Sequence, residues 1–392
     1  MAGTKESMES AAYAALGASS AKGGVLKAVG EHATSRYFAT PLADPFGDPS
    51  QAFFLHADGA GTKSIVAYLM FRETGDPSWF RSLAIDSLVM NLDDLACAGA
   101  LSGLALSNTI GRNRLLIPDE AISQIIDGYR ECVTALRAHG ISIALSGGET
   151  ADVGDLVRTI IVDSTLSARI PREALVDAYR VTDGDVIVGF SSTGKTAHEA
   201  FANSGIGSNG LTLARNVLLS RYHIDTYPES GDPSISADVA YRGPFKVTDV
   251  APTLGDTIGS ALLAPTRSYA PLIHRALTEF RTAIHSLVHC TGGGQVKIKR
   301  FGQRVRFEKD NLFETPPLFS LIQEHGRVPW AEMYSVFNMG HRLEACVEPS
   351  VASELIDLAA QFGIAAKIVG RVSSTSGDNE VIISSPHGEF IY

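Results

Sequence analysis

The feature that most constrains the fold of this chain is a short apolar run followed directly by a glycine-rich acidic turn. Residues 55–63 read L-H-A-D-G-A-G-T-K, which favours a strand followed by a flexible turn. Gly59 and Gly61 let the backbone come close to an anion. Thr62 and Lys63 supply hydrogen-bond donors and positive charge. The turn therefore predicts a phosphate site, although an ordinary turn at a strand end has the same composition.

A second segment adds acids at helical spacing. Residues 84–95 place apolar side chains at helical intervals, and Asp86 and Asp93, seven residues apart, share one face of the expected helix. Neither they nor Asp94 have a cation within the segment to neutralise them. Together with Asp58 of the turn they favour a bound cation. An exposed acidic face, or acids that stabilise the helix N-terminus, is the alternative.

A third segment ends in a pair of glycines. Residues 143–152 resemble a buried strand that breaks at Gly147 and Gly148 and then presents Glu149, with Asp152 close behind. Because ligands gather at strand ends in α/β layers, the three segments predict one site for nucleotide phosphates and one or more Mg²⁺ ions. Its expected metal ligands are Asp58, Asp86, Asp93, Asp94 and Glu149.

These segments resemble, in order, the motifs of the aminoimidazole ribonucleotide (AIR) synthetase family, also called phosphoribosylformylglycinamidine cyclo-ligases, of the PurM-like superfamily. D-G-x-G-T-K matches residues 58–63, I-D-x-x-x-M-x-x-x-D-L matches 85–95, and G-G-E-T-A matches 147–151. The resemblance runs from about residue 55 to 370. Four later blocks match in the same order, at 208–210, 263–269, 284–294 and 332–340.

The chain departs from this family at three places. The family typically has a His directly before Ser-Asn-Gly, where this chain has Gly207. Residues 41–50 replace a glycine-rich stretch, and residues 221–250 resemble an insertion. The role of the missing His is therefore not carried over, and we expect a divergent subgroup with the same reaction.

The resemblance implies an α+β, two-domain PurM-like fold, in which an N-terminal sheet domain forms a homodimer and a C-terminal α/β domain follows. It implies ATP-dependent ring closure of formylglycinamidine ribonucleotide to 5-aminoimidazole ribonucleotide, with Mg²⁺ as the metal ion and ADP and phosphate as the other products. Lys63, Asp93 and Glu149 are then the expected catalytic residues. The expected nucleotide-binding residues are Asp58, Gly59, Gly61, Thr62, Lys63, Asp86, Gly147, Gly148, Thr150, Asn209, Gly292, Gly293 and Gly294.

Other members of the superfamily and a non-catalytic role are the alternatives. Selenophosphate synthetase needs a reactive Cys near the N-terminus, and none precedes Cys97; a hydrogenase maturation protein needs a C-terminal Cys, and the chain ends at Tyr392. Thiamine phosphate kinase stays open, although the blocks at 291–294 and 332–334 favour AIR synthetase. A non-catalytic nucleotide-binding subunit, suggested by Gly207, is opposed by the five retained acids.

Residues 189–196, G-F-S-S-T-G-K-T, fit the P-loop pattern after an apolar strand. In a P-loop, Lys195 would reach the β and γ phosphates and Thr196 would hold Mg²⁺. Against this, no later apolar strand ends in an Asp, and residues 203–207 break the following helix within two turns. We therefore interpret residues 195–205 as a local elaboration.

Three features near residue 290 remain ambiguous from sequence. The glycines at 292–294 fit either a phosphate nest or a turn needed for packing. His285 and His289 share a strand face, which suits a metal pair that lacks a third ligand or two core histidines. The basic cluster at 297–300 is expected to be a solvated strand end.

Length and composition set broader limits. A chain of 392 residues predicts two domains. We expect an arm at 1–50 with a short helix near 21–29, a first domain at 51–170, which the resemblance implies to be the ATP-binding one, and a second domain at 171–392. The net charge of −10 argues against a nucleic-acid surface. No apolar stretch is long enough to span a membrane and no signal peptide is present, so we expect a cytoplasmic protein. The four cysteines lack a C-x-x-C pair and are expected to be free and mostly buried.

Periodicity predicts the order strand, helix, strand, helix, strand, strand for residues 52–170, with helices near 80–98 and 118–138. The second domain is expected to open with a strand at 186–190. Its other expected elements are helices near 208–219, 267–281, 316–325 and 350–362 and strands near 284–290, 341–348, 365–372 and 380–385.

Overall fold

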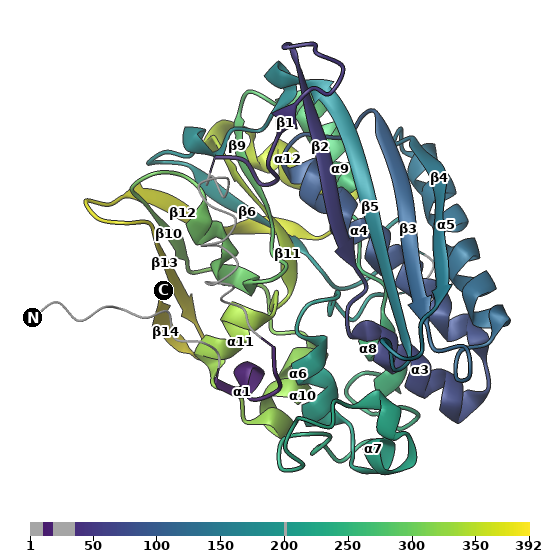
Figure 1. Ribbon diagram of the computed structural model, residues 1–392. Coiled ribbons are helices and arrows are strands. Elements are labelled where there is room, and N and C mark those ends of the chain that lie inside the picture. Colours follow the sequence, from purple (N-terminus) through teal and green to yellow (C-terminus); the bar gives the residue numbers. More distant parts are fainter. Residues whose placement is uncertain (1–10, 19–35, 200–201) are drawn as a thin grey trace, which may run out of the picture.

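The computed structural model describes residues 11–18, 36–199 and 202–392; the helix expected near 21–29 lies outside them. Within these residues, a five-stranded and a seven-stranded sheet each pack against helices (Figure 1), so the expected α+β class is confirmed. None of the helices in these ranges has the length and apolar character that crossing a membrane requires.

The first sheet has the strand order β1-β2-β5-β3-β4. β5 runs antiparallel to β2 and to β3, whereas β3 and β4 are parallel, as strands joined by a helical crossover must be. Side chains along β5 alternate between buried and more exposed, so this sheet has one packed face. The bounds are β1 (Leu42–Ala43), β2 (Gln51–Gly59), β3 (Leu104–Arg112), β4 (Ile143–Asp152) and β5 (Ile160–Pro171).

The helices α3 (Lys63–Thr74), α4 (Arg81–Cys97) and α5 (Asp119–Ala138) belong to this domain, with a short 3₁₀ turn η2 (Pro77–Phe80) before α4. The sequence predicted α4 and α5 within one residue or so, but missed α3. The residues of α3 are apolar on most sides because the helix is buried, so they show no amphipathic stripe.

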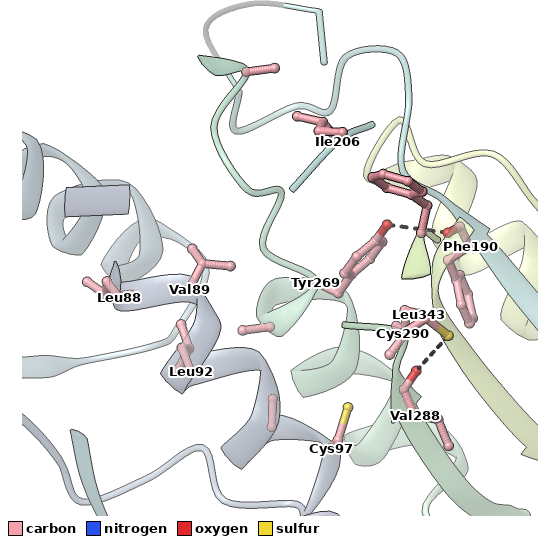
Figure 2. Packing of buried hydrophobic residues seen from close by; sticks show 14 of the residues in the cluster. Leu88, Val89, Leu92, Cys97, Phe190, Ile206, Tyr269, Val288, Cys290 and Leu343 are labelled. Carbon is pink, nitrogen blue, oxygen red and sulfur yellow. Dashed lines mark hydrogen bonds between the residues drawn. The ribbon is translucent and has the colours of Figure 1, made fainter. Parts of the chain in front are cut away.

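Helix α4 lies between the two domains. One side of it contacts β2 and β5, and another contacts α9 (Ala270–Phe280) and β9 (Ile284–His289). Figure 2 shows Leu88, Val89 and Leu92 of α4 opposite Tyr269 and Phe190 of the second domain. Almost every side chain of α4 is buried, so its acids need partners inside the protein.

The second sheet has the order β14-β13-β10-β12-β6-β11-β9. Its predicted elements are all present, with bounds that shift by a few residues. The strands are β6 (Val186–Ser191), β9, β10 (Val305–Lys309), β11 (His341–Val347), β12 (Ala366–Ser374), β13 (Glu380–Ser385) and β14 (Gly388–Ile391). The helices are α6 (Leu211–Leu218), α8 (Ile258–Leu263), α9, α10 (Pro317–Gly326), α11 (Trp330–Val336) and α12 (Ala352–Gln361).

Two segments of the second domain differ from simple expectation. Residues 297–300 are not a strand end but part of the 3₁₀ helix η6 (Gly294–Arg300), because Gly293 and Gly294 take positive φ and turn the chain. Residues 221–250, the expected insertion, hold only the short turns α7 (Tyr222–Thr226) and η5 (Pro228–Ser230) as helical structure.

The four cysteines are free, as expected. Cys97, Cys290 and Cys346 are buried and Cys132 is partly buried. Burial raises the pKa of the Cys290 thiol well above its ordinary value, which leaves it a poor nucleophile at neutral pH.

We predict that Gly128→Ala destabilises the fold, although Ala favours a helix more than Gly does. An added Cβ would lie 2.4 Å from the Arg81 carbonyl oxygen and 3.0 Å from the Ala84 Cβ, so α4 and α5 would have to separate. The expected loss in free energy of unfolding is about 1–3 kcal/mol, measured by urea denaturation. Thr134→Ala, on the exposed side of α5, is the control and should be neutral or slightly stabilising. Equal changes in the free energy of unfolding for Gly128→Ala and Thr134→Ala would contradict this packing of α4 against α5.

Candidate active site

The turn after β2 presents an acid at the end of the strand. The Asp58 Oδ1 accepts a hydrogen bond from the Gly59 backbone N–H at 2.7 Å. Gly59 is required here, because an added Cβ would lie 2.8 Å from the Val162 backbone carbonyl oxygen, in addition to 1.7 Å from Oδ1 of Asp163 on β5. Burial raises the pKa of Asp58 above its ordinary value, and the charge of Asp94 raises it further. Asp58 therefore lies in a region that favours a bound cation.

Asp86 of α4 binds the second domain. Its Oδ1 receives hydrogen bonds from the backbone N–H and the hydroxyl of Thr266, at 2.8 and 2.6 Å. The same oxygen lies 2.8 Å from the Lys63 Nζ, and the Lys63 ammonium also donates to the Ala264 carbonyl at 2.5 Å. Both side chains are fully buried, and burial lowers the pKa of Lys63 despite the Asp86 charge.

Asp93 binds the next residues of the same segment. Its Oδ1 accepts from the Ser268 hydroxyl at 2.8 Å and its Oδ2 from the Tyr269 backbone N–H at 2.9 Å, just before α9 begins. Burial raises the pKa of the Asp93 carboxyl. Asp86 and Asp93 do share a helix face, as predicted, and that face holds residues 264–269.

These contacts give three of the predicted site residues partners inside the protein. Lys63 has no exposed surface and two acceptors inside the protein, so it links the two domains in this structure. Asp93 has both oxygens engaged by protein donors, and Asp86 serves Lys63 and Thr266. No group of three or more His, Cys, Asp or Glu in the described ranges is arranged to hold a metal ion, so the five acids stay a prediction as metal ligands.

Asp94 lies on a different side of α4, among basic groups. The His289 Nδ1 is 2.8 Å from its Oδ1, and the His56 Nε2 is 3.5 Å from its Oδ2. Burial alone would raise the pKa of Asp94, but the Lys297 charge and the His289 hydrogen bond outweigh it and hold the pKa below the ordinary value. Asp94 is therefore an ionised acid at neutral pH, and Asp58 is close enough for the two charges to interact.

Glu149 lies apart from Asp58 and Asp94. Four paired residues form a row across the sheet: Glu149 of β4, Thr109 of β3, Asp163 of β5 and Gly59 of β2. Glu149 and Gly59 are therefore about three strand spacings, roughly 14 Å, apart. The prediction missed that β5, last in sequence, is inserted between β2 and β3. Gly147, Gly148 and Thr150 share β4 with Glu149 and are exposed on this edge strand.

The second domain faces the turn after β2. The Thr62 hydroxyl is 2.9 Å from that of Thr212, at the start of α6. Lys297 of η6 donates to the Thr291 hydroxyl at 3.1 Å. Beside them, a small pocket is lined by Ile206, Ser208, Asn209, Cys290, Thr291, Val336, Phe337, Asn338 and Arg342.

Among the glycines at 292–294, one is needed for packing and another borders open space. An added Cβ at Gly294 would lie 2.5 Å from the Phe337 carbonyl oxygen and 2.6 Å from that of Tyr334, so this glycine is needed for packing. At Gly292 the nearest atom to an added Cβ is the Asn209 Oδ1, at 3.5 Å, so this position is open.

The P-loop pattern does not form a P-loop. Described residues 192–199 and 202–210 contain no helix, so the helix that must follow such a loop is missing there. The carbonyl oxygens of Ser191, Thr193 and Gly194 accept hydrogen bonds from the Arg267 guanidinium. A phosphate cradle needs N–H groups turned inward, and this loop turns its carbonyls inward instead.

Sequence reasoning missed several residues at this site. His56 lies inside the strand predicted before the turn, and Lys297 belongs to the cluster expected at a solvated strand end. His289 was one of two histidines considered as a metal pair; both instead bind carboxylates, His289 at Asp94 and His285 at Asp185, where Nδ1 lies 2.9 Å from Oδ2. Their strand positions were visible in the sequence, but their carboxylate partners lie far along the chain.

The fold and this site define a PurM-like, two-domain protein. Models of the AIR synthase related protein N-terminal domain and C-terminal domain match residues 42–169 and 182–383. This chain therefore belongs to the AIR synthase related family, as the motifs indicated.

Named relatives and solved structures agree with this placement. A phosphoribosylformylglycinamidine cyclo-ligase of Methanocaldococcus jannaschii is 32% identical over 83% of this chain and 79% of its own length. One from Methanothermobacter thermautotrophicus is 31% identical, over 87% and 85%. PurL of T. maritima complexed with FGAR has a TM-score of 0.51 and 14% identity, over 92% of this chain and 47% of that one. Thiamine-monophosphate kinase of Stenotrophomonas maltophilia has a TM-score of 0.51 and 16% identity, over 87% and 90%. These two structures support the fold alone.

We predict that Asp86→Asn lowers the free energy of unfolding by about 3–5 kcal/mol, because it leaves the Lys63 ammonium buried without a counter-charge. Urea denaturation measures the change. Asp127→Asn removes an exposed ion pair with Arg130, at 3.3 Å, and should change stability little. A similar small loss in both variants would show that the buried pair does not hold the domains together.

Proposed function

We propose that this chain is a phosphoribosylformylglycinamidine cyclo-ligase, which uses ATP to close the imidazole ring of 5-aminoimidazole ribonucleotide. Relatives of that name, in archaea and in the bacterium Pseudothermotoga lettingae, are 28–32% identical over most of the chain. The observation that carries the proposal is the contact of the two domains at Asp94, whose Oδ1 lies 2.8 Å from the His289 Nδ1, with Asp58 of the glycine turn and Lys297 of η6 close enough for their charges to interact with it.

The protein contributes to this reaction mainly by positioning the reactants and neutralising charge. The formamide oxygen of the substrate takes the γ-phosphoryl group of ATP, and the amidine nitrogen then displaces phosphate as the ring closes. Bound Mg²⁺ would neutralise phosphate charge, and it commonly takes one or two carboxylates together with phosphate oxygens and waters. Asp58 and Asp94 fit that requirement, because their charges interact and because each has one carboxylate oxygen engaged by a hydrogen bond among the described residues, whereas Asp93 has both oxygens engaged.

The other residues of this site act on charge and orientation. Lys297 places an ammonium group where the nucleotide phosphates would lie, and His289 orients the Asp94 carboxylate. Gly59, Gly61, Thr62, Asn209, Gly292 and Gly293 remain the proposed contacts of the nucleotide.

The direct test mixes purified protein with ATP, Mg²⁺ and formylglycinamidine ribonucleotide and follows ADP and the aminoimidazole product together. We expect both products in equal amounts. ADP without the imidazole product, or ATP-dependent phosphorylation of thiamine monophosphate instead, would contradict the proposal.

We predict that Asp58→Asn lowers kcat/KM by 100-fold or more and leaves thermal stability unchanged or higher, because the neutral amide cannot bind Mg²⁺ but avoids the cost of burying a charge. Activity assays and thermal unfolding measure the two effects. Asp127→Asn on exposed α5 is the control and should change neither. Lost stability together with lost activity would indicate a structural role for Asp58.

The same residue predicts a pH effect in the wild type. Because its pKa is raised, Asp58 takes up a proton as the pH falls toward a value above the ordinary Asp range. Protonation competes with the metal, so the Mg²⁺ concentration needed for half-maximal rate should rise as the pH falls through that window. A Mg²⁺ requirement that stays constant down to the ordinary Asp pKa would count against Asp58 as a ligand.

We further propose that two copies associate through the first sheet. Its outer face, toward the viewer in Figure 1, exposes Leu55 and Ile161, which are 62% and 41% accessible, and Glu149 lies on the same face. An uncovered apolar sheet face of this kind commonly marks an interface. A homodimer through this face would bring Glu149 of each copy to the junction.

We predict that Leu55→Arg converts the protein to a monomer, since the added charge would be buried between two sheets. Light scattering coupled to size-exclusion chromatography measures the mass. Leu115→Arg is the control, because Leu115 is 95% exposed on a loop after β3. A monomeric wild type, or equal behaviour of the two variants, would refute this interface.

A further inference from the structure

Arg342 combines charge, burial and unused hydrogen-bond donors. Its side chain is 1% exposed, and its guanidinium lies over the Tyr269 ring, 5.5 Å from the centroid. Nη2 donates to the Arg267 carbonyl oxygen. Within the described ranges, no group accepts a hydrogen bond from Nε or Nη1. A buried guanidinium with idle N–H groups costs stability unless an acceptor from outside the chain satisfies it.

The backbone at Arg342 is irregular. β11 pairs with β6 through His341 and Ser191, then through Leu343 and Phe190, and the register shifts between these pairs. Arg342 is therefore the extra residue of a β-bulge, a feature that commonly redirects a side chain near a functional site.

The idle nitrogens belong to a side chain that lines a pocket. Ser208, Asn209, Thr291 and Asn338 line the same pocket, and among the described residues that form it there is no carboxylate. Lys297 donates to Thr291 from beside it. The pocket thus has a cationic, donor-rich wall, and the nearby carboxylates, Asp86 behind Ser208 and Asp93, already accept hydrogen bonds from other groups of the protein.

Gly207 makes room for this arrangement. Its φ is +67°, and an added Cβ would lie 2.8 Å from the Arg342 Nη1. A side chain at position 207 would therefore both strain the backbone and displace the guanidinium. Gly207 and Arg342 form a matched pair in this chain.

We propose that Arg342 and this pocket bind a phosphate group of a ligand, through charge-assisted hydrogen bonds from Nε and Nη1 to its oxygens. Two ligands contain such a phosphate group: the ribonucleotide substrate, with its 5-phosphate, and ATP. The choice between these sources rests on the proposed function, whereas the phosphate site itself does not.

Inorganic phosphate tests the site without any substrate. We expect phosphate to raise the Tm of the wild type relative to chloride at equal ionic strength, and to leave the Tm of Arg342→Met unchanged. The Met variant should fold, because it removes an unsatisfied buried charge. An equal phosphate-induced shift in both proteins would overturn the proposal.

Gly207→Ala tests the same site without removing the charge. It should lose the phosphate-induced shift, because its Cβ crowds Nη1. Gly184→Ala is the matched control, since Gly184 also has positive φ, +92°, but open space around an added Cβ. If Arg342→Met fails to fold, the comparison of Gly207→Ala with Gly184→Ala tests the site. A phosphate-induced rise in Tm that is undiminished in Gly207→Ala overturns the proposal.

Equilibrium dialysis identifies the source of the phosphate. We expect Arg342→Met to weaken binding of either formylglycinamidine ribonucleotide or ATP by about 30- to 100-fold, and the other by less than about 3-fold. Unchanged affinity for both would overturn the proposal. A wild type that binds no ribonucleotide would refute the proposed function, and the inorganic phosphate experiment would still decide the site.

Discussion

The buried contact between α4 and residues 264–269 determines how the two domains meet. Asp86 and Asp93 accept hydrogen bonds from the backbone N–H groups of Thr266 and Tyr269, and Lys63 neutralises Asp86. Charges buried this deeply are tolerated only with such partners. Because the contact fixes one domain against the other, Asp58 and Asp94 of the first domain come to face His289 and Lys297 of the second.

Helical geometry explains why neighbouring acids have different environments. Residues seven apart on α4 point in nearly the same direction, so Asp86 and Asp93 reach the same segment, whereas Asp94 is turned by about 100° from Asp93. There its carboxylate interacts with two histidines and a lysine, which together outweigh the effect of burial and keep Asp94 ionised. One helix thus supplies both the interdomain anchor and the acid that we propose as a metal ligand.

The sequence predicted the amphipathic helix α5, the helical spacing of α4 and most strands of the second sheet, because these follow local periodicity. It missed α3, which is buried on most sides, and η6, which depends on the positive φ of two glycines. The motifs located the family and the acid-bearing turns. They could not separate anchoring acids from Asp58 and Asp94, or reveal that β5 separates Glu149 from Asp58, because these facts depend on contacts between distant segments.

Metal binding by variants at two adjacent positions tests this account most directly. Mn²⁺, which shares the oxygen preference of Mg²⁺, would be titrated in the presence of ATP and followed by electron paramagnetic resonance, with Asp93→Asn and Asp94→Asn compared with the wild type. The account predicts that Asp94→Asn folds normally and loses the bound Mn²⁺, whereas Asp93→Asn is destabilised and, when folded, still binds it. Mn²⁺ lost from Asp93→Asn and retained by Asp94→Asn would contradict it.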